Sequence, residues 1–325
     1  MTNDIGTSKI ALVIGATGGV GGAVAANLAK RGWQIRALNR NIARARNANP
    51  AYDWRQGDAM VAADLSVAAQ GVDVIVHAVN PPGYRDWDRL VLPMLDHSIA
   101  AARAVGARLL LPGTVYNYGP DAFPLLREDS PQHAQTRKGA IRVEMERRLR
   151  EAAGGGAMRA LVVRAGDFFG PQPGNNWLSQ GVLKSGSASR RIVNPAAPGV
   201  GHAWAYLPDV AETMVRLLEQ EARLAPFDSF HFEGLWDADG TQTVEAIRRV
   251  LGRKLPVSRF PWALLPLLAP FNTTLREMRE MRYLWQQPVR LDNRRLAAFL
   301  GAEPRTPLDQ ALRQAIAGLD RARAA

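Results

Sequence analysis

The sequence predicts an α/β fold, a doubly wound parallel sheet followed by a smaller, mainly helical C-terminal part. In the first half of the chain, short runs of apolar residues alternate with helical patterns. This alternation is typical of parallel strands joined by helices on both faces of a sheet. A glycine-rich turn follows the first apolar run. The second half is rich in loops and then in helices, which indicates insertions after strand ends rather than a separable domain.

The first strand is expected at residues 10–14, and the turn after it reads GATGGVG. Gly15 lets the chain leave the strand at backbone angles that are costly for other residues. Gly18 has no side chain to block a phosphate, and Gly21 lets the following helix pack close to the strand. We therefore predict that this turn holds the pyrophosphate of a dinucleotide at a helix N-terminus. The contacts expected from the turn are Gly15, Thr17, Gly18, Gly19 and Val20.

The helix after the turn carries one apolar stripe, because Val20, Val24 and Leu28 lie four residues apart. A second strand is expected over residues 33–38, which alternate in polarity. The first 40 residues therefore form the strand, turn, helix and strand of a dinucleotide-binding unit.

The residues that end the second strand choose between the two nicotinamide cofactors. A site for NAD places an Asp or Glu here to accept from the ribose hydroxyls, whereas a site for NADP has an Arg for the 2′-phosphate. This chain has Asn39 and Arg40, with Arg44 and Arg46 in the next turn and no acidic residue nearby. A planar guanidinium suits a phosphate monoester, so we predict NADP(H) in preference to NAD(H). A solvated arginine at a strand end is the alternative.

The later elements alternate in the same way. Further strands are expected at 52–56, 73–79, 108–111, 161–164 and 230–232. Helices are expected at about 86–105, 136–153 and 207–221, and over most of 241–320. The stretch 168–203 is rich in loops, and long irregular segments of this kind usually carry function.

Composition limits the class of protein. The chain has 325 residues, 47% of them hydrophobic, and no cysteine. The lack of cysteine excludes disulfides, Cys-ligated zinc and thiol catalysis, and we predict no metal site. The first residues lack the apolar run of a signal peptide, so we expect a cytoplasmic protein.

The most apolar later segment is PWALLPLLAPF, residues 261–271. It is too short and too often broken by proline to span a membrane, which needs about 20 apolar residues. Two interpretations remain open, a core or subunit-contact helix and a surface for an apolar substrate.

The net charge of +11 comes from 41 Lys and Arg against 30 Asp and Glu. The basic residues are spread along the chain among acidic ones, and no nucleic-acid-binding motif is present. A general positive field also attracts an anionic dinucleotide or a phosphorylated substrate. We therefore predict a small-molecule substrate and no nucleic-acid partner.

The GATGGVG turn resembles that of the short-chain dehydrogenase/reductase superfamily, especially its extended and atypical members, the NAD-dependent epimerase/dehydratase-like proteins. The resemblance covers most of residues 8–215. It implies a Rossmann fold with a dinucleotide-binding domain and a substrate-binding part, and a homodimer through two helices of the sheet layer. The dinucleotide-binding domain is expected at 1–165 and 203–235, and the substrate-binding part at 166–202 and 236–325.

The same resemblance adds two cofactor contacts. Asp58 matches an aspartate near the adenine, where its carboxylate would accept from the amino group. The alternative for Asp58 is a helix cap. Ala78 lies in the stretch that passes beside the adenine ribose. Its neighbour His77 is followed by apolar residues within a strand, so we expect an uncharged, buried histidine there.

The resemblance also implies where the chemistry occurs. The family uses a Ser or Thr hydroxyl near the substrate carbonyl, together with a Tyr and a Lys four residues apart on one helix face. In LLLPGTVYNYG, residues 109–119, Thr114 matches the hydroxyl, or else it satisfies the loop backbone. Lys138 matches the lysine that holds the nicotinamide ribose, with a solvated lysine as the alternative. Ala134 stands where the family has its acid/base Tyr.

Three substitutes for the missing tyrosine are open. Tyr116 ranks first because it lies two residues beyond Thr114, and Tyr118 shares its loop. His133 precedes the helix and can transfer protons near neutral pH. Lys138 can protonate an oxyanion if burial lowers its pKa. The predicted catalytic residues are Thr114, Tyr116 and Lys138.

Later motifs extend the resemblance. RAGDFFGP, residues 164–171, matches a loop that borders the nicotinamide, so Phe168 and Phe169 are expected to wall the pocket. Asp209 stands at the start of an expected helix, where its negative charge interacts favourably with the positive end of the helix dipole. The residues that choose the substrate are expected within 80–90, 168–203 and 255–290.

These expectations lead to two functional hypotheses. The first is an NADP(H)-binding oxidoreductase or epimerase-like enzyme that acts on a hydroxyl or carbonyl compound, with a sugar nucleotide as one candidate. The alternative is a non-catalytic NADP(H)-binding sensor or regulatory protein, which the missing tyrosine favours.

Overall fold

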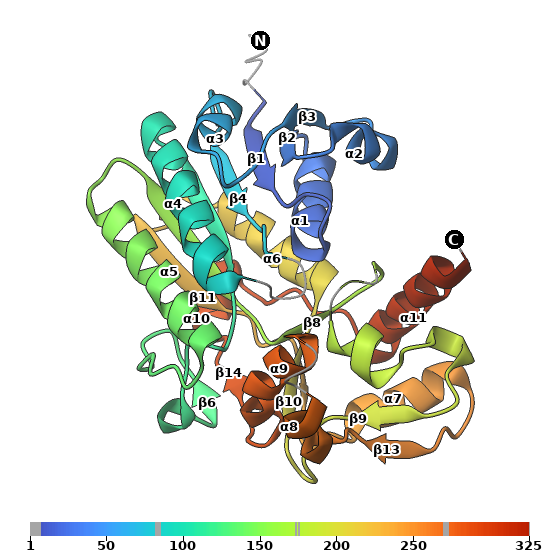
Figure 1. Cartoon of the computed structure of the whole chain (residues 1–325). Helices are drawn as coiled ribbons and strands as arrows, with labels where there is room; N and C mark the ends of the chain where they lie inside the picture. Colours follow the sequence, from blue (N-terminus) through green and yellow to red (C-terminus); the bar gives the residue numbers. More distant parts are fainter. Residues whose placement is uncertain (1–7, 82–85, 173, 175, 269–272, 325) are drawn as a thin grey trace.

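Seven parallel strands form the central sheet of the computed structural model, which describes residues 8–81, 86–172, 174, 176–268 and 273–324 (Figure 1). The strand order is β11-β7-β5-β4-β1-β2-β3. The chain therefore builds the sheet outward from β1 in one direction and then returns to build it from β4 in the other. The strands are β1 (Ile10–Ile14), β2 (Gln34–Asn39), β3 (Asp53–Gln56), β4 (Val74–His77), β5 (Arg108–Gly113), β7 (Arg159–Arg164) and β11 (Phe227–His231).

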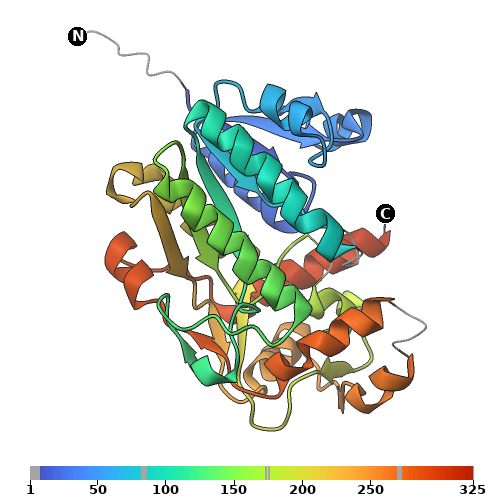
Figure 2. The same ribbon diagram turned by 60° about the vertical axis from the view of Figure 1, so that its left-hand side comes forward.

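Helices cover both faces of this sheet, which confirms the predicted doubly wound fold. Helices α4 and α5 lie side by side on one face (Figure 2), together with α3, while α1 and α6 pack against the other face. The short α2 lies beside β3. Their bounds are α1 (Gly19–Lys30), α2 (Ile42–Ala48), α3 (Ala62–Ala68), α4 (Trp87–Val105), α5 (Arg137–Gly154) and α6 (Leu207–Glu219).

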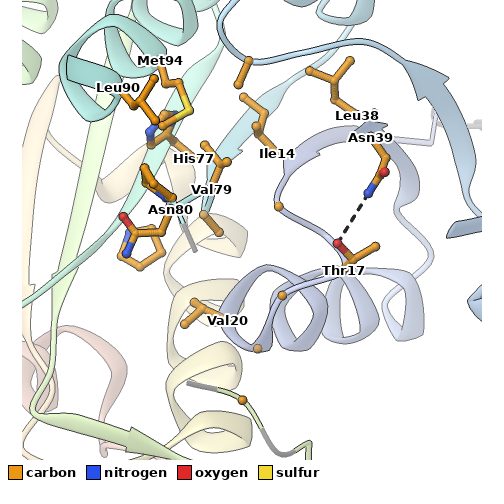
Figure 3. Close-up of a pocket in the computed structure, with 18 of the residues that line it drawn as sticks. Ile14, Thr17, Val20, Leu38, Asn39, His77, Val79, Asn80, Leu90 and Met94 are labelled. Atoms are coloured by element: carbon orange, nitrogen blue, oxygen red, sulfur yellow. Dashed lines mark hydrogen bonds between the residues drawn. The ribbon is translucent and has the colours of Figure 1, made fainter. Parts of the chain in front are cut away.

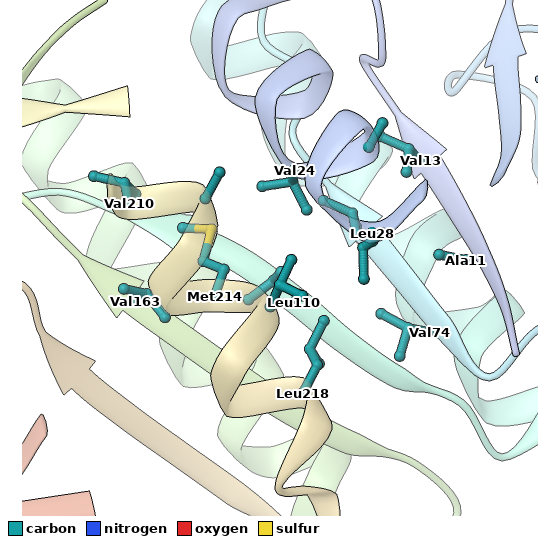
Figure 4. Packing of buried hydrophobic residues seen from close by; sticks show 14 of the residues in the cluster. Ala11, Val13, Val24, Leu28, Val74, Leu110, Val163, Val210, Met214 and Leu218 are labelled. Atoms are coloured by element: carbon teal, nitrogen blue, oxygen red, sulfur yellow. The ribbon is translucent and has the colours of Figure 1, made fainter. Parts of the chain in front are cut away.

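The apolar stripe predicted for α1 forms part of the core. Val24 and Leu28 are completely buried and lie in one cluster with Met214 and Leu218 of α6, on the same face of the sheet (Figure 4). Burying a side chain of this size stabilises the fold by roughly 1.5–3 kcal/mol. The stripe therefore fixes α1, and with it the glycine turn at the helix N-terminus.

The stretch 168–203 contains more regular structure than the sequence indicated. Strands β8 (Asp167–Phe169), β10 (His202–Tyr206) and β12 (Leu235–Asp237) form a second, three-stranded sheet. Two strand pairs join distant segments, β9 (Ile192–Asn194) with β13 (Val257–Arg259), and β6 (Leu125–Leu126) with β14 (Arg290–Leu291). These strands have two to five residues, too few to give a periodic pattern.

The C-terminal region is mainly helical, as predicted. Its helices are α7 (Gln242–Leu251), α8 (Leu265–Leu268), α9 (Thr273–Glu280), α10 (Arg294–Leu300) and α11 (Leu308–Ala324). Asp209 interacts with more than the α6 dipole. Its carboxylate accepts hydrogen bonds from the backbone N–H and the hydroxyl of Thr306, both at 2.7 Å. This pair of hydrogen bonds ties the segment before α11 to the start of α6.

The apolar segment 261–271 lies partly outside the described residues. Leu265 is buried, but Leu264 and Leu267 are 51% and 70% exposed. A helix buried in the core is therefore wrong for these two leucines. No helix in the described ranges has the length and apolar character needed to cross a membrane.

Candidate dinucleotide and substrate site

A cavity of about 690 Å³ opens at the carboxyl ends of the central strands (Figure 3). It lies where β1 and β4 are neighbours and the strand order reverses, which is where open α/β sheets bind ligands. Ile14, Thr17 and Asn39 line one side, and Leu90 and Met94 of α4 line another. We call this space the strand-end cavity.

The glycine turn brings backbone to the cavity wall with no room for side chains. Gly15 has a φ of +93°, and a Cβ placed on it would lie 2.6 Å from the carbonyl oxygen of Ala78. A Cβ on Gly21 would lie 2.3 Å from the carbonyl oxygen of Gly15. Gly18 is the N-cap of α1, which has no acidic residue in its first turn. The positive end of this helix therefore faces the cavity without a competing carboxylate, which suits a pyrophosphate.

The end of the cavity beside β2 carries an arginine. The Asn39 side-chain amide donates to the Thr17 hydroxyl at 3.5 Å, and the exposed Arg40 follows on the wall. The lining residue with a carboxylate is Asp58, in the part of the chain that the structure describes. Its carboxylate accepts a hydrogen bond from the backbone N–H of Met60 at 2.9 Å, which stabilises a turn. Asp58 therefore has a structural role as well as a place on the cavity wall.

The structure brings the predicted cofactor contacts together, with Lys138 as the exception. The residues on the cavity wall are Gly15, Thr17, Gly18, Gly19, Val20, Asn39, Arg40, Asp58 and Ala78. Lys138 is absent from this wall and its side chain is completely buried. It is therefore not the solvated lysine that was its alternative. A contact between Lys138 and the cofactor stays a prediction.

Sequence reasoning missed Arg142, which lies one helical turn beyond Lys138 in α5 and lines the cavity. Its guanidinium carbon is 5.2 Å from the centre of the Trp87 ring, and its Nη1 donates to the carbonyl oxygen of Pro112 at 3.4 Å. The sequence contained a signal for Arg142, because it lies four residues after Lys138 and residues at this spacing share one helix face. Only the packing of α5 decides which of the two reaches the cavity.

Thr114 and Tyr116 follow the end of β5, and both line the cavity. The Thr114 hydroxyl accepts from the backbone N–H of Tyr116 at 3.2 Å. The two alternatives for Thr114 are therefore compatible, since a hydroxyl that accepts this bond keeps its own hydrogen for another group. Thr114 and Tyr116 form the hydroxyl pair of the cavity.

The other candidates for proton transfer lie elsewhere. Tyr118 is completely buried, and its hydroxyl is 3.0 Å from Nε2 of His231. His133 has a side chain 71% exposed and pairs with Asp121 at 2.7 Å. Neither residue lines the strand-end cavity.

A buried network fixes the loop that carries the hydroxyl pair. Glu146 of α5 pairs with Arg164 of β7 and accepts from the Asn117 amide at 3.0 Å. Arg164 in turn donates to Nε2 of His231 at 3.0 Å, while Nδ1 of that ring lies 3.1 Å from the carbonyl oxygen of Leu126. Because Asn117 follows Tyr116 directly, this network anchors the chain next to Tyr116.

His77 is the neutral buried histidine that the sequence indicated. Its Nδ1 is 2.8 Å from the Ser98 hydroxyl. Burial, with the positive charge of Arg142, lowers the pKa of His77 to about 3. At neutral pH the imidazole therefore carries no charge.

The two phenylalanines of β8 point into different surroundings. Phe168 lines the cavity, whereas Phe169 is buried in an aromatic cluster with Trp204 and Tyr206. Adjacent strand residues point to opposite faces, so the expectation that both wall the pocket is wrong for Phe169. Beyond β8, Gln172 and Asn176 extend the wall.

The family model of the NAD-dependent epimerase/dehydratase family matches residues 11–230, from the first strand to the last strand of the central sheet. The chain belongs to this family. The resemblance of the glycine turn is thereby confirmed. Family membership makes the protein an NAD(P)-dependent oxidoreductase or epimerase with a nicotinamide dinucleotide as its cofactor.

Individual relatives agree with this assignment. A 3-diazoavenalumate denitrifying reductase from a Streptomyces species is 27% identical over 276 residues, which cover 79% of this chain and 86% of that protein. Among solved structures, MoeE5 in complex with UDP-glucose and NAD is 16% identical with a TM-score of 0.75, covering 97% of this chain and 99% of that one. UDP-N-acetylglucosamine 4-epimerase from Bacillus cereus is 16% identical with a TM-score of 0.74, and the match covers 97% of both chains. These two structures are similar to the chain in fold.

Proposed function

We propose that the protein is an NADPH-dependent reductase for the carbonyl group of a small organic substrate. The observation that carries the proposal is the strand-end cavity, in which the glycine turn, Arg40 and the hydroxyl pair share one space. The Streptomyces relative is also a reductase.

The preference for NADPH rests on the end of β2. Asn39 and Arg40 stand on the cavity wall where an NAD site would have a carboxylate. A guanidinium there would pair with the 2′-phosphate of the adenosine ribose. Asp58, the acidic lining residue, would accept from the adenine amino group.

In this proposal the hydroxyl pair binds the carbonyl oxygen of the substrate and supplies the proton that this oxygen takes up. Bound NADPH supplies a hydride to the carbonyl carbon. Thr114 and Tyr116 donate hydrogen bonds to the carbonyl oxygen, and the Tyr116 phenol gives up its proton to that oxygen as the alcohol forms. The phenolate left on Tyr116 regains a proton from solvent. The charge of Arg142 stabilises negative charge on the ligands in the cavity.

The second candidate is an NADPH-binding sensor without turnover. Ala134 and the buried Lys138 favour it, because neither places an acid/base group on the cavity wall.

Turnover measurements separate the two candidates. We expect a panel of aldehydes and ketones to include substrates that consume NADPH, followed by its absorbance. T114V and Y116F should lower kcat by roughly 10²-fold or more and leave the dissociation constant for NADPH unchanged. The control Y52F removes a phenol hydroxyl from a residue outside the cavity and should keep the parent kcat. NADPH binding without consumption of any panel compound would favour the sensor.

A further inference from the structure

A second cavity, of about 490 Å³, lies at the N-terminal end of α5. Arg137 of α5 lines it, together with Arg279 of α9 and Arg282 of the following 3-10 helix η8 (Met281–Trp285). Figure 2 shows the C-terminal helices beside this end of α5. We call this space the arginine cavity.

Backbone and side chains give the arginine cavity a positive potential. It includes Thr136, the N-cap of α5, whose hydroxyl accepts from the backbone N–H of Gly139 at 3.0 Å. Helix α5 has 18 residues and no acidic residue in its first turn, so its positive dipole end faces the cavity. Among the described lining residues Glu280 is the acidic one, and its carboxylate oxygen is 3.9 Å from Nε of Arg137.

An aromatic wall with an unused hydroxyl completes the arginine cavity. The Tyr283 ring stacks on Phe123, with ring centres 6.3 Å apart and an angle of 6° between planes. The Tyr283 hydroxyl oxygen is buried and makes no hydrogen bond within the described part of the chain. Such a group is costly unless a ligand or water satisfies it. The wall therefore suits a ligand with an apolar or aromatic body beside its anionic group.

Tyr116 relates this space to the strand-end cavity through packing. It lines the strand-end cavity, and it packs against the same buried apolar cluster as Phe123 and Tyr283. Its carbonyl oxygen is in close contact with Gly139 at the start of α5, where a Cβ would lie 2.3 Å away. The backbone of Tyr116 therefore contacts α5 at the helix end where Thr136 and Arg137 line the arginine cavity.

We propose that the arginine cavity binds the anionic group of the substrate, a carboxylate or a phosphate. The substrate class is then an organic anion with an apolar or aromatic body whose carbonyl group reaches Thr114. This inference rests on the proposed reductase function and adds the substrate's charge to it.

Calorimetric titration of the NADPH-saturated protein tests the inference with three probes: benzoate, phenyl phosphate and the neutral benzamide. We expect benzoate or phenyl phosphate to bind at least roughly tenfold more tightly than benzamide, because charge-assisted bonds to arginine exceed neutral ones. R279Q and R282Q should each lower the affinity for the anion roughly fivefold, and R282K should lower it less. E280Q should raise this affinity, because it removes the competing carboxylate.

The matched control is R103Q, which removes an exposed arginine from the last turn of α4, outside both cavities. It should change anion affinity less than twofold. Tighter binding of phenyl phosphate identifies a phosphate, and tighter binding of benzoate identifies a carboxylate. The inference is overturned if benzamide binds as tightly as both anions, or if R103Q weakens them as much as R282Q. Failure to bind NADPH would instead refute the proposed function, and the same titrations without NADPH would then decide the anion site.

Discussion

At the scale of single residues, Arg40 decides the choice of cofactor in our proposal. Its guanidinium is exposed at the edge of the strand-end cavity, and the neighbouring Asn39 is held by Thr17. The partner expected for Arg40 is a phosphate that NADH lacks. The two cofactors should therefore differ mainly in this one contact.

We expect R40D to reverse the preference between NADPH and NADH. A hydrogen bond between charged groups contributes about 1.5–3 kcal/mol, so the loss of Arg40 should weaken NADPH more than tenfold. NADH should bind as well as before or better, since the new carboxylate can accept from the ribose hydroxyls. Calorimetric dissociation constants for both cofactors measure the change. R46Q, on α2 but outside the cavity, is the control, and equal affinities of the parent protein for both cofactors would refute the assignment.

The cofactor residues predicted next to strand ends line the strand-end cavity, whereas Lys138, predicted on a helix, does not. Gly15, Gly18 and Arg40 have fixed positions relative to a strand end, so a motif is enough to place them. Lys138 and Arg142 differ by one turn of the same helix face. Which of them reaches the cavity depends on the position of α5 along the sheet, and tertiary contacts set that position.

At the scale of elements, the two ends of α1 offer a comparison. Gly15 before the helix and Gly32 after it both have positive φ, +93° and +80°. Around Gly15 a Cβ would meet the backbone of Ala78 at 2.6 Å, whereas around Gly32 it would meet nothing within 4 Å. The first position therefore adds a steric clash to the conformational cost, and the second has that cost alone.

We expect G32A to lower the free energy of unfolding by about 1–2 kcal/mol, the cost of a left-handed residue, and to keep the affinity for NADPH. G15A should lower it further and should abolish measurable NADPH binding, because β1 and β4 must separate to admit the methyl group. Urea unfolding and calorimetry provide the two readouts. Equal unfolding free energies for G15A and G32A would show that the contact with Ala78 is not tight.

Regular alternation explains which parts of the fold could be predicted. The strands of the seven-stranded sheet alternate with the amphipathic helices α1, α4, α5 and α6, which have 12 to 19 residues. The three-stranded sheet of β8, β10 and β12 was not predicted, because its strands lie outside this alternation and pair across 30 or more residues. Pairing of these strands is set by the surfaces on which they pack.

At the scale of the whole molecule, two buried histidines make stability depend on pH. Burial, with the charges of Arg142 and Arg164, lowers the pKa of His77 and of His231 to about 3. In the unfolded chain a histidine titrates near 6.5. The unfolded state therefore binds more protons below this pH. The contribution of the neutral histidines to stability is complete above pH 6.5 and is lost as the pH falls from 6.5 toward 3.

We expect the free energy of unfolding to fall by up to about 1.4 kcal/mol per histidine for each pH unit below 6.5. Urea unfolding at several pH values between 7.5 and 5.0 measures the slope. H77N should make the slope shallower, because an amide can bond to Ser98 without titrating. A slope that H77N leaves unchanged would contradict this origin of the pH dependence.

Tyr116 lines the strand-end cavity and packs against the same buried cluster as Tyr283 of the arginine cavity, and this position has a thermodynamic consequence. If an anion changes the affinity for NADPH by some factor, NADPH must change the affinity for that anion by the same factor. Reciprocity of this kind can be measured from four dissociation constants, without a known substrate. The coupling would then be the same whichever of the two ligands binds first.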